Sequence, residues 1–380
     1  MRLMITVLLL ASLLPAQQVG RGEFDQDQWN RAVGLGGQEA MFSLRRSNRE
    51  STPCELAAIK AGLRWLQQQQ RKDGSWPCEH NMDARVAMTS LCALAMLGDG
   101  NTMRVGPHRE SLKKAVGWLR VRQKKNGAFA SATGPHLLAT LAMTESLHLS
   151  DYKLLKKSAA EGVAHAATLR STDGGWRATP NRDTSAPSLT LWGTTLLATA
   201  AAADLIPIDN ACEGVLDWLR STQATLAPES GILGKEVPMV RQAELAHDQA
   251  AANAFTLCWL AIDNRDPAVR AAMQADADAM RNNALTRARS HSRIWEQNPK
   301  HRLSINEWFC SAHALAQAGD QKSVAAICKS LAKAQVADGE DRGSWAPIGV
   351  WGDGGGRVWT TAMAVLTLEA PFRYAKITGR

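Results

Sequence analysis

A segment that closes on an aromatic residue recurs along the chain, and it limits the possible folds more than any other feature. "KAGLRWLQQQQRKDGSW" (Lys60 to Trp76) aligns with "KAVGWLRVRQKKNGAF" (Lys114 to Phe129): the Lys-Ala start, the Trp-Leu pair, a glutamine, a glycine and the closing aromatic coincide. Each copy is followed by an alanine- and leucine-rich stretch, so the repeated unit is a helix, a turn and a second helix, about fifty residues long. Further copies are found around Trp176, Trp218 and Trp345, and a degenerate one lies between Ala268 and Trp295.

The two helices of a unit differ in polarity, and the difference indicates how the units assemble. The first helix is amphipathic, whereas the second is apolar or small nearly all the way round, as expected for a helix buried among others. An open stack of hairpins needs polar caps, but a closed ring buries both ends, and no capping repeat is evident. The sequence therefore predicts one all-α domain over residues 51–375, an α/α toroid of six helical hairpins with inner and outer helix rings. Its units are expected at about 59–100, 112–150, 155–205, 211–264, 268–320 and 322–374.

Tryptophan is unusually common beside the other aromatic residues, with 13 Trp against 6 Phe and 2 Tyr. In the first segment, Asp73 and Gly74 provide a turn that ends the helix. Trp76 can then fold back over apolar surface and donate its indole N–H to a glutamine or a carbonyl. We therefore interpret the tryptophans of the repeat as packing residues that join neighbouring helices: Trp65, Trp76, Trp118, Trp176, Trp218 and Trp345.

The first residues of the chain have the features of an export signal. One arginine precedes an apolar run from Leu3 to Leu14 and the small residues after it, which predicts a signal peptide over residues 1–16, cleaved after Ala16. Residues 17–50 are polar and are expected to form an N-terminal extension. No later stretch approaches the roughly twenty apolar residues of a membrane span. We expect a secreted or periplasmic protein without a transmembrane anchor.

Charge and cysteine content exclude some classes of protein. The formal charge is +8, but the Lys and Arg residues are scattered and form no block typical of a nucleic-acid-binding arm. The sequence thus predicts a mildly basic surface and no nucleic-acid partner. Seven dispersed cysteines are too few for a disulfide scaffold, although export permits bridges, and the odd count leaves at least one thiol unpaired within the chain.

The repeat resembles a known motif. Its pattern of Lys-Ala, Trp-Leu, Gln, Gly and Trp, complete from Lys60 to Trp76, is similar to the QW motif of squalene and hopene cyclases, members of the prenyltransferase/squalene oxidase repeat family. The last unit, Gly356 to Tyr374, resembles the closing repeat of exported cyclase-like proteins. The resemblance implies the terpenoid cyclase/protein prenyltransferase toroid, with outer helices tied together by the glutamine and aromatic of the motif. It also implies that any chemistry lies at the inner helices and the loops leading into them.

The catalytic strings of these relatives are absent. Bacterial cyclases use the central acid of an Asp-x-Asp-Asp motif, and protein prenyltransferases hold zinc with an Asp-x-Cys pair and a distant His; the nearest string here is "ADADAM", with Asp276 and Asp278. Cys310 and His313 share a helix face, and "CEH" ending at His80 is a comparable cluster, but two ligands do not make a zinc site. We expect no metal and no other cofactor.

Polar and aromatic residues near the starts of the inner helices are the candidate site. If the ring closes, they should converge at one mouth of the toroid, a concave and mixed surface of the kind that ligands prefer. Asp248 and Glu307 could alternatively be the acid and base of a glycosidase or lyase, and acids at helix starts also cap N–H groups without any ligand. The candidate ligand-binding residues are Asp83, His136, Trp192, His247, Asp248, Glu307, Trp308, Arg357 and Trp359.

The sequence therefore favours an exported, cyclase-like repeat protein that binds a ligand or partner in or around the central cavity rather than a catalyst. The partner is expected to be an apolar small molecule or an extracellular protein. Two alternatives stay open: a terpenoid cyclase-like enzyme with non-standard acids, and a carbohydrate-active lyase or hydrolase. If side chains fill the cavity, the insertion from Leu226 to Leu245 becomes the best candidate for partner contact.

Overall fold

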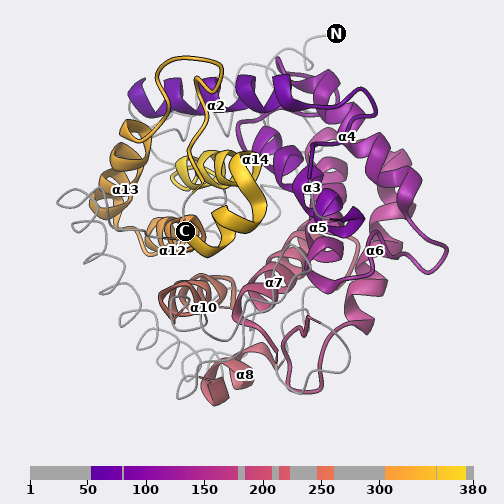
Figure 1. The fold of residues 1–380 in the computed structure, drawn as a ribbon. Coiled ribbons are helices and arrows are strands. Elements are labelled where there is room, and N and C mark those ends of the chain that lie inside the picture. The colour runs from indigo at the N-terminus through magenta and orange to yellow at the C-terminus, as the bar shows by residue number, and fades with distance from the viewer. Residues whose placement is uncertain are drawn as a thin grey trace, which may run out of the picture.

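Helices form the regular structure of the described chain (Figure 1). The computed structural model describes residues 53–78, 81–178, 185–207, 214–222, 246–260, 304–347 and 349–373. The predicted signal peptide, the N-terminal extension, the "ADADAM" string and the Leu226–Leu245 insertion lie outside these ranges. Among the described helices, none combines the length and the apolar character needed to cross a bilayer.

Six helices form a closed inner ring. Each packs against the next in chain order, and the last one packs against the first (Figure 1). The predicted closed all-α toroid is therefore confirmed. The inner helices are α3 (Met82–Gly98), α5 (Thr133–Ser150), α7 (Pro187–Ala202), α10 (Ala246–Leu260), α12 (Ile305–Gln317) and α14 (Gly349–Leu368).

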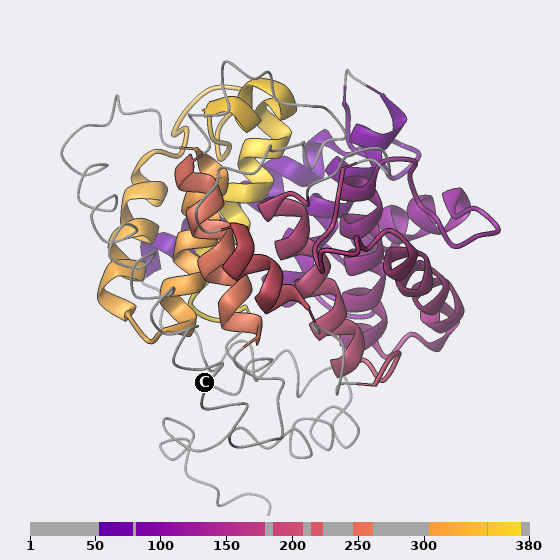
Figure 2. The same ribbon diagram turned by 90° about the horizontal axis from the view of Figure 1, so that it is seen from below.

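A second set of helices surrounds this ring. In the view turned by 90°, outer and inner helices stand side by side around the axis (Figure 2). Helix α13 near the C-terminus contacts α2 at the start of the toroid, so the outer layer also joins its two ends. The outer helices within the described ranges are α2 (Pro53–Gln69), α4 (Arg109–Arg122), α6 (Lys156–Thr168), which follows the short 3-10 helix η1 (Lys153–Leu155), α8 (Val215–Thr222) and α13 (Gln321–Lys333).

The inner helices tolerate many hydroxyl side chains because these residues bond within their own helix. Ser90 Oγ donates to the carbonyl of Val86 at 2.7 Å, and Thr195 Oγ1 donates to that of Leu191 at 2.8 Å. Such bonds to the residue four positions earlier remove the cost of burying a free hydroxyl. The inner ring can therefore be buried on all sides, as its lack of a polar face predicts.

The repeated glutamine joins one outer helix to the next. Gln70 Nε2 donates to the carbonyls of Gly74 and Ser111, both at 2.9 Å, and its Oε1 accepts from the Ser111 hydroxyl at the start of α4. Gly74, at φ +95°, lies so close to the Lys114 carbonyl that a Cβ would collide with it. The turn thus requires glycine both for its conformation and for its contact with α4.

The closing tryptophan fixes the same turn to its own unit. Trp76 Nε1 donates to the Leu66 carbonyl at 2.6 Å, and its ring is fully buried, which confirms the packing role and the carbonyl partner predicted for it. Asp73 receives bonds from Ser75 and, at 3.1 Å, from Nε1 of Trp118 in the next unit. Burial alone would raise the pKa of Asp73, but these bonds outweigh it and lower the pKa.

The last copy of the motif closes the outer ring. Gln335 Nε2 donates at 2.8 Å both to the Gly343 carbonyl in its own turn and to the Ala58 carbonyl in α2. Trp345 Nε1 donates to the Leu331 carbonyl at 2.8 Å. The contact that joins successive units elsewhere therefore joins the final unit to the first.

A buried ion cluster closes the inner ring. Arg373, which follows α14, donates through Nη2 to both carboxylate oxygens of Glu145 on α5, at 2.8 and 3.0 Å. Its Nη1 donates to Glu369 at 2.9 Å and to the Leu94 carbonyl of α3 at 2.7 Å. All three charged side chains are almost completely buried. Breaking such a group is costly because it leaves an uncompensated charge in the interior.

Gly98 leaves the space for this ion cluster, which gives a stability prediction. A Cβ at Gly98 would overlap the Glu369 carboxylate and the Arg373 guanidinium. We expect Gly98→Ala to lower the free energy of unfolding by about 1–3 kcal/mol. Gly117→Ala on α4 is the matched control: a Cβ there meets nothing within 4 Å, so the change should raise stability by about 0.5–1 kcal/mol. Urea denaturation midpoints should move in opposite directions; a neutral Gly98→Ala would contradict the packing.

Gln335→Ala tests the closure of the outer ring. The substitution leaves the Ala58 and Gly343 carbonyls without their shared donor, so we expect a loss of about 1–3 kcal/mol, seen as a lower midpoint of thermal or urea unfolding. Gln68→Ala, an exposed position on α2, should change stability by less than about 0.5 kcal/mol. Equal effects of the two changes would show that the glutamine contact contributes nothing specific.

Candidate functional site: the axis of the ring

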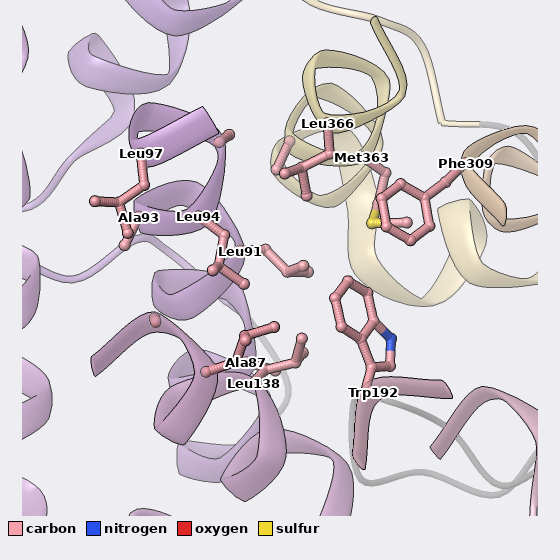
Figure 3. Close-up of a cluster of buried hydrophobic side chains, with 14 of the residues drawn as sticks. Ala87, Leu91, Ala93, Leu94, Leu97, Leu138, Trp192, Phe309, Met363 and Leu366 are labelled. Carbon is pink, nitrogen blue, oxygen red and sulfur yellow. The ribbon is translucent and has the colours of Figure 1, made fainter. Parts of the chain in front are cut away.

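Apolar side chains from opposite inner helices meet at the axis (Figure 3). Leu91 of α3 points toward Trp192 of α7, and Phe309 of α12 lies beside Met363 of α14 in the same view. Trp192 and Phe309 are stacked, with ring centroids 5.3 Å apart. All of these side chains are buried, so the axis is packed with side chains at this level.

The buried polar atoms without a hydrogen-bond partner within the described chain include one on each of α7, α14 and α12, which are helices that supply this apolar group. These three are Nε1 of Trp192, Nε1 of Trp359 and Oδ1 of Asn306. Their residues are at most 2% exposed. Asn306 lies one helical turn before Phe309, and Trp359 one turn before Met363, so each precedes an axial residue on its own helix. A buried polar atom without a partner costs about 1–3 kcal/mol, which calls for an explanation.

Two predicted site residues make contacts that link units of the toroid. Asp83, in the first turn of α3, accepts the backbone N–H groups of Ser131 and Ala132 just before α5, at 2.8 to 3.1 Å. Arg357 forms an ion pair with Asp341 at 3.1 Å and donates to Ser344 at 3.1 Å, both in the last repeated turn. Both side chains are therefore bonded away from the axis.

His136 is held by two backbone groups. Its Nδ1 accepts the N–H of Phe129 at 3.2 Å, so Nε2 carries the proton and donates to the Gly162 carbonyl at 3.1 Å. Burial, with a smaller effect of His165, lowers the pKa of His136 to about 3. The ring is therefore neutral at ordinary pH, and it connects the turn of its own unit to α6.

His136 accepts the backbone N–H of the closing aromatic residue of its unit, and in three other units a threonine hydroxyl accepts this bond instead. These threonines were not identified from the sequence. The backbone N–H of the closing tryptophan donates to a threonine hydroxyl on the following inner helix, at 3.1 to 3.3 Å. The only available indication was a threonine 13 to 16 positions after each of these aromatics. The pairs are Trp76 with Thr89, Trp176 with Thr190, and Trp345 with Thr361.

The other predicted residues divide between the axis and regions that are not described. Trp192 is buried in the axial group, Trp359 is buried on α14, and Glu307 and Trp308 are buried in the first turn of α12. His247 and Asp248 fall within α10, but their side chains lie outside the described residues, as does the proposed pairing of Asp248 with Glu307. Among the described members, Trp192 is the one that Figure 3 places in the axial group.

No group of three or more potential metal ligands occurs among the described residues. Of the two sequence clusters considered, "CEH" includes His80, which is not described. His313 Nε2 donates to the Leu366 carbonyl at 3.0 Å, and the ring packs against Phe255 and Phe309. Burial, then Arg373, lower the pKa of His313 to about 3. Burial has the opposite effect on the Cys92 thiol, whose pKa it raises, because the charged form of a thiol is the deprotonated one. Cys92 is one of four described cysteines that form no disulfide.

The two buried histidines predict how stability depends on pH. An unfolded histidine has a pKa near 6.5, whereas His136 and His313 have folded values of about 3, so the unfolded chain binds more protons below pH 6.5. Stability should be highest above this pH and fall by about 1 kcal/mol per pH unit for each histidine as the solution is acidified. Urea midpoints measured from about pH 7 to 4.5 should show the slope, and His136→Gln should make it shallower. A midpoint that does not change over this range would contradict the neutral buried state.

Comparisons with known proteins were made against families, curated proteins and solved structures. No family model and no curated protein matches the chain. A solved structure described as a novel alpha-amylase from Clostridium perfringens is similar at 9% identity, covering 83% of this chain and 97% of that one, with a TM-score of 0.53. This likeness shows the fold alone.

Type II terpene cyclase structures are also similar to the chain. The enzyme MstE from Scytonema, in complex with geranylgeranyl dihydroxybenzoate, is 17% identical, covers 84% of this chain and 98% of its own, and has a TM-score of 0.49. Its apo form is 16% identical, with 86% and 100% coverage and a TM-score of 0.49. A terpene cyclase is thus among the structures that resemble this all-α toroid.

Proposed function

We propose that the chain is an exported toroid protein that binds an apolar alcohol along its axis and does not convert it. The observation that carries this proposal is a set of three buried polar atoms without partners on the inner helices that supply the apolar axial group. Two are indole N–H donors, on Trp192 and Trp359, and the third is the Asn306 side-chain oxygen. A hydroxyl group can accept from an indole and donate to an amide oxygen, so it complements both kinds of atom.

The apolar body of the ligand would lie among Leu91, Leu138, Phe309 and Met363. These side chains are buried against one another, so binding must open space by rotamer changes. Methionine has three rotatable bonds and adapts to such changes more easily than branched or aromatic residues. The favourable term is the removal of the ligand's hydrocarbon from water, about 25 cal/mol per Å² of apolar surface.

Binding without turnover is supported by the contacts of three described carboxylates on or next to the inner helices. Asp83 accepts backbone N–H groups at the entrance to α5, and Glu145 and Glu369 hold Arg373 in the buried ion cluster. A carboxylate engaged in these bonds is not free to reach a ligand at the axis. The sequence also contains no Asp-x-Asp-Asp string.

The test compares an isoprenoid alcohol, geranylgeraniol, with the hydrocarbon of the same chain length. Trp192→Phe and Trp359→Phe keep an aromatic ring but remove the donor, so each should weaken binding of the alcohol about tenfold, corresponding to one hydrogen bond. Binding of the hydrocarbon should not change. Dissociation constants can be measured by titration calorimetry in detergent below its micelle concentration.

Trp118→Phe is the matched control. It also removes an indole N–H, but one that donates to Asp73 on the outer layer, so alcohol affinity should be unchanged. If all three variants bind the alcohol as the unmodified protein does, the axial site is wrong. If mass spectrometry of the recovered ligand shows a cyclised product, the absence of turnover is wrong.

A further inference from the structure

The positive charge of this chain is concentrated in the first three units. Residues 53–178 contain eighteen Lys and Arg and ten Asp and Glu, which accounts for the whole formal charge of +8 and leaves the remainder of the sequence balanced. No run of basic residues reveals this, because the residues are spaced along amphipathic helices. Nine of the eighteen lie on α2, α4 and α6, which are consecutive outer helices of the toroid (Figure 1).

Helix α4 carries the densest part of this charge. Arg109, Lys113 and Arg120 recur at spacings of four and seven residues, so they form one stripe about 16 Å long on the exposed side of the helix, and exposed Lys124 follows two residues after the helix ends. Gly117 occupies the middle of the stripe and has open space around it. The opposite face of α4 is buried against the toroid, so the stripe faces solvent along its whole length.

The acidic residues of the same units neutralise little of this surface. Asp73 bonds Ser75 and Trp118, Asp83 bonds the backbone before α5, and Glu145 is buried with Arg373. Three other acids lie nearer the exposed charge: Glu110 pairs with Arg109 and Lys113 at the start of α4, Glu161 pairs with Lys157 on α6, and Asp151 is exposed. Exposed Arg120 in the second half of α4 forms no ion pair with an acid among the described residues, so its positive charge is available to a ligand in solution.

The positive field extends from α4 to its neighbours. Burial and then Lys124 lower the pKa of His165 on α6. The pKa of His108, just before α4, is lowered mainly by burial; Asp99 opposes the shift and Arg64 of α2 adds to it. Lysines and arginines on three adjacent outer elements thus act on the same surface.

We call the exposed members of α2, α4, α6 and their connections the basic face: Lys60, Arg64, Arg71, Lys72, Arg104, Arg109, Lys113, Lys114, Arg120, Lys124, Lys125, Lys153, Lys156 and Lys157.

We propose that the basic face binds a linear acidic polysaccharide, such as a sulfated or uronic-acid glycan. A flexible polyanion can bend around the convex outer layer and contact charges on successive helices, with counterion release as the driving force. A stiff duplex would touch a convex surface over a short arc only. The proposal is independent of the axial ligand but shares with it the expectation that the protein is exported.

Other polyanions fit this face less well. Among the described residues, the exposed large apolar side chains are Met82, Val121 and Leu154, so the face offers no aromatic platform on which single-stranded bases could stack. Trp118 is buried, with Arg122 lying over its ring at 3.7 Å. A lipid surface would need an apolar helix face to insert, and the apolar face of α4 already packs on the toroid.

The experiment measures binding of fluorescein-labelled heparin by fluorescence anisotropy at about 0.1 M salt. One variant changes Lys114, Arg120, Lys124 and Lys125 to glutamine. Its matched control changes four exposed residues on and after α13, on the other side of α2 from α4, namely Lys322, Lys329, Lys333 and Arg342, to glutamine, so both variants lose the same charge. Thermal melts of both verify that they fold. Removal of the α4 charges should weaken heparin binding about tenfold or more and reduce the salt dependence, whereas the α13 variant should stay within about twofold.

The other polyanions provide the remaining arms of the experiment. Duplex DNA and vesicles containing phosphatidylserine should bind more weakly than heparin, and neutral dextran should not bind. Equal losses for the two variants would show that only net charge matters and would overturn the proposal. Tighter binding of DNA or of vesicles than of heparin would overturn the choice of a polysaccharide.

Discussion

The toroid depends on the contact between its last inner helix and its first. Each hairpin exposes an apolar inner helix that it cannot cover by itself, and neighbouring hairpins cover it on two sides. A ring removes the uncovered ends only if α14 meets α3, and Arg373 helps to fix this meeting by bonding α3 and α5 from beyond the end of α14. Gly98 is the corresponding adaptation on α3, because a larger residue would displace the charges.

In the outer layer, neighbouring units are joined by a repeated set of hydrogen bonds. The glutamine of each complete motif bonds its own turn and the beginning of the next outer helix, and glycine allows the backbones to approach. In the third unit Arg170 replaces the glutamine and bonds the Gly174 carbonyl. The motif residues are therefore explained by assembly of the units, which leaves the axis and the outer surface as the places where ligands could bind.

The axis and the basic face are physically different kinds of surface. At the axis, water is excluded and a single unpaired N–H matters, so recognition there would depend on one polar group and a matching hydrocarbon volume. On the basic face, water and salt are present, and affinity would come from many weak, screened contacts. The two proposals thus predict opposite responses to salt, which allows them to be tested in one protein.

Several parts of the candidate site could not be predicted from the sequence. Trp192 and Trp359 were correctly placed on inner helices, but nothing in the sequence shows that their N–H groups lack partners, because that depends on what opposite helices present. Asp83 and Arg357 looked like mouth residues, yet their charges are used by Ser131, Ala132 and Asp341 in neighbouring segments. Phe309 and Met363 could have been found from the helical spacing that relates them to Asn306 and Trp359.

The sequence by itself determined the helical units, their inner and outer members and the packing role of the repeat tryptophans. These follow from periodicity and turn chemistry, which act over a few residues and are written directly in the chain. Only the tertiary structure decided the pairing of Glu145 with Arg373, 228 residues apart, and the gathering of scattered lysines and arginines on one side of the ring. The ion pair arises because closing the ring brings distant segments together, and local sequence patterns contain no information about such a contact; the basic face arises because successive outer helices turn their polar sides outward.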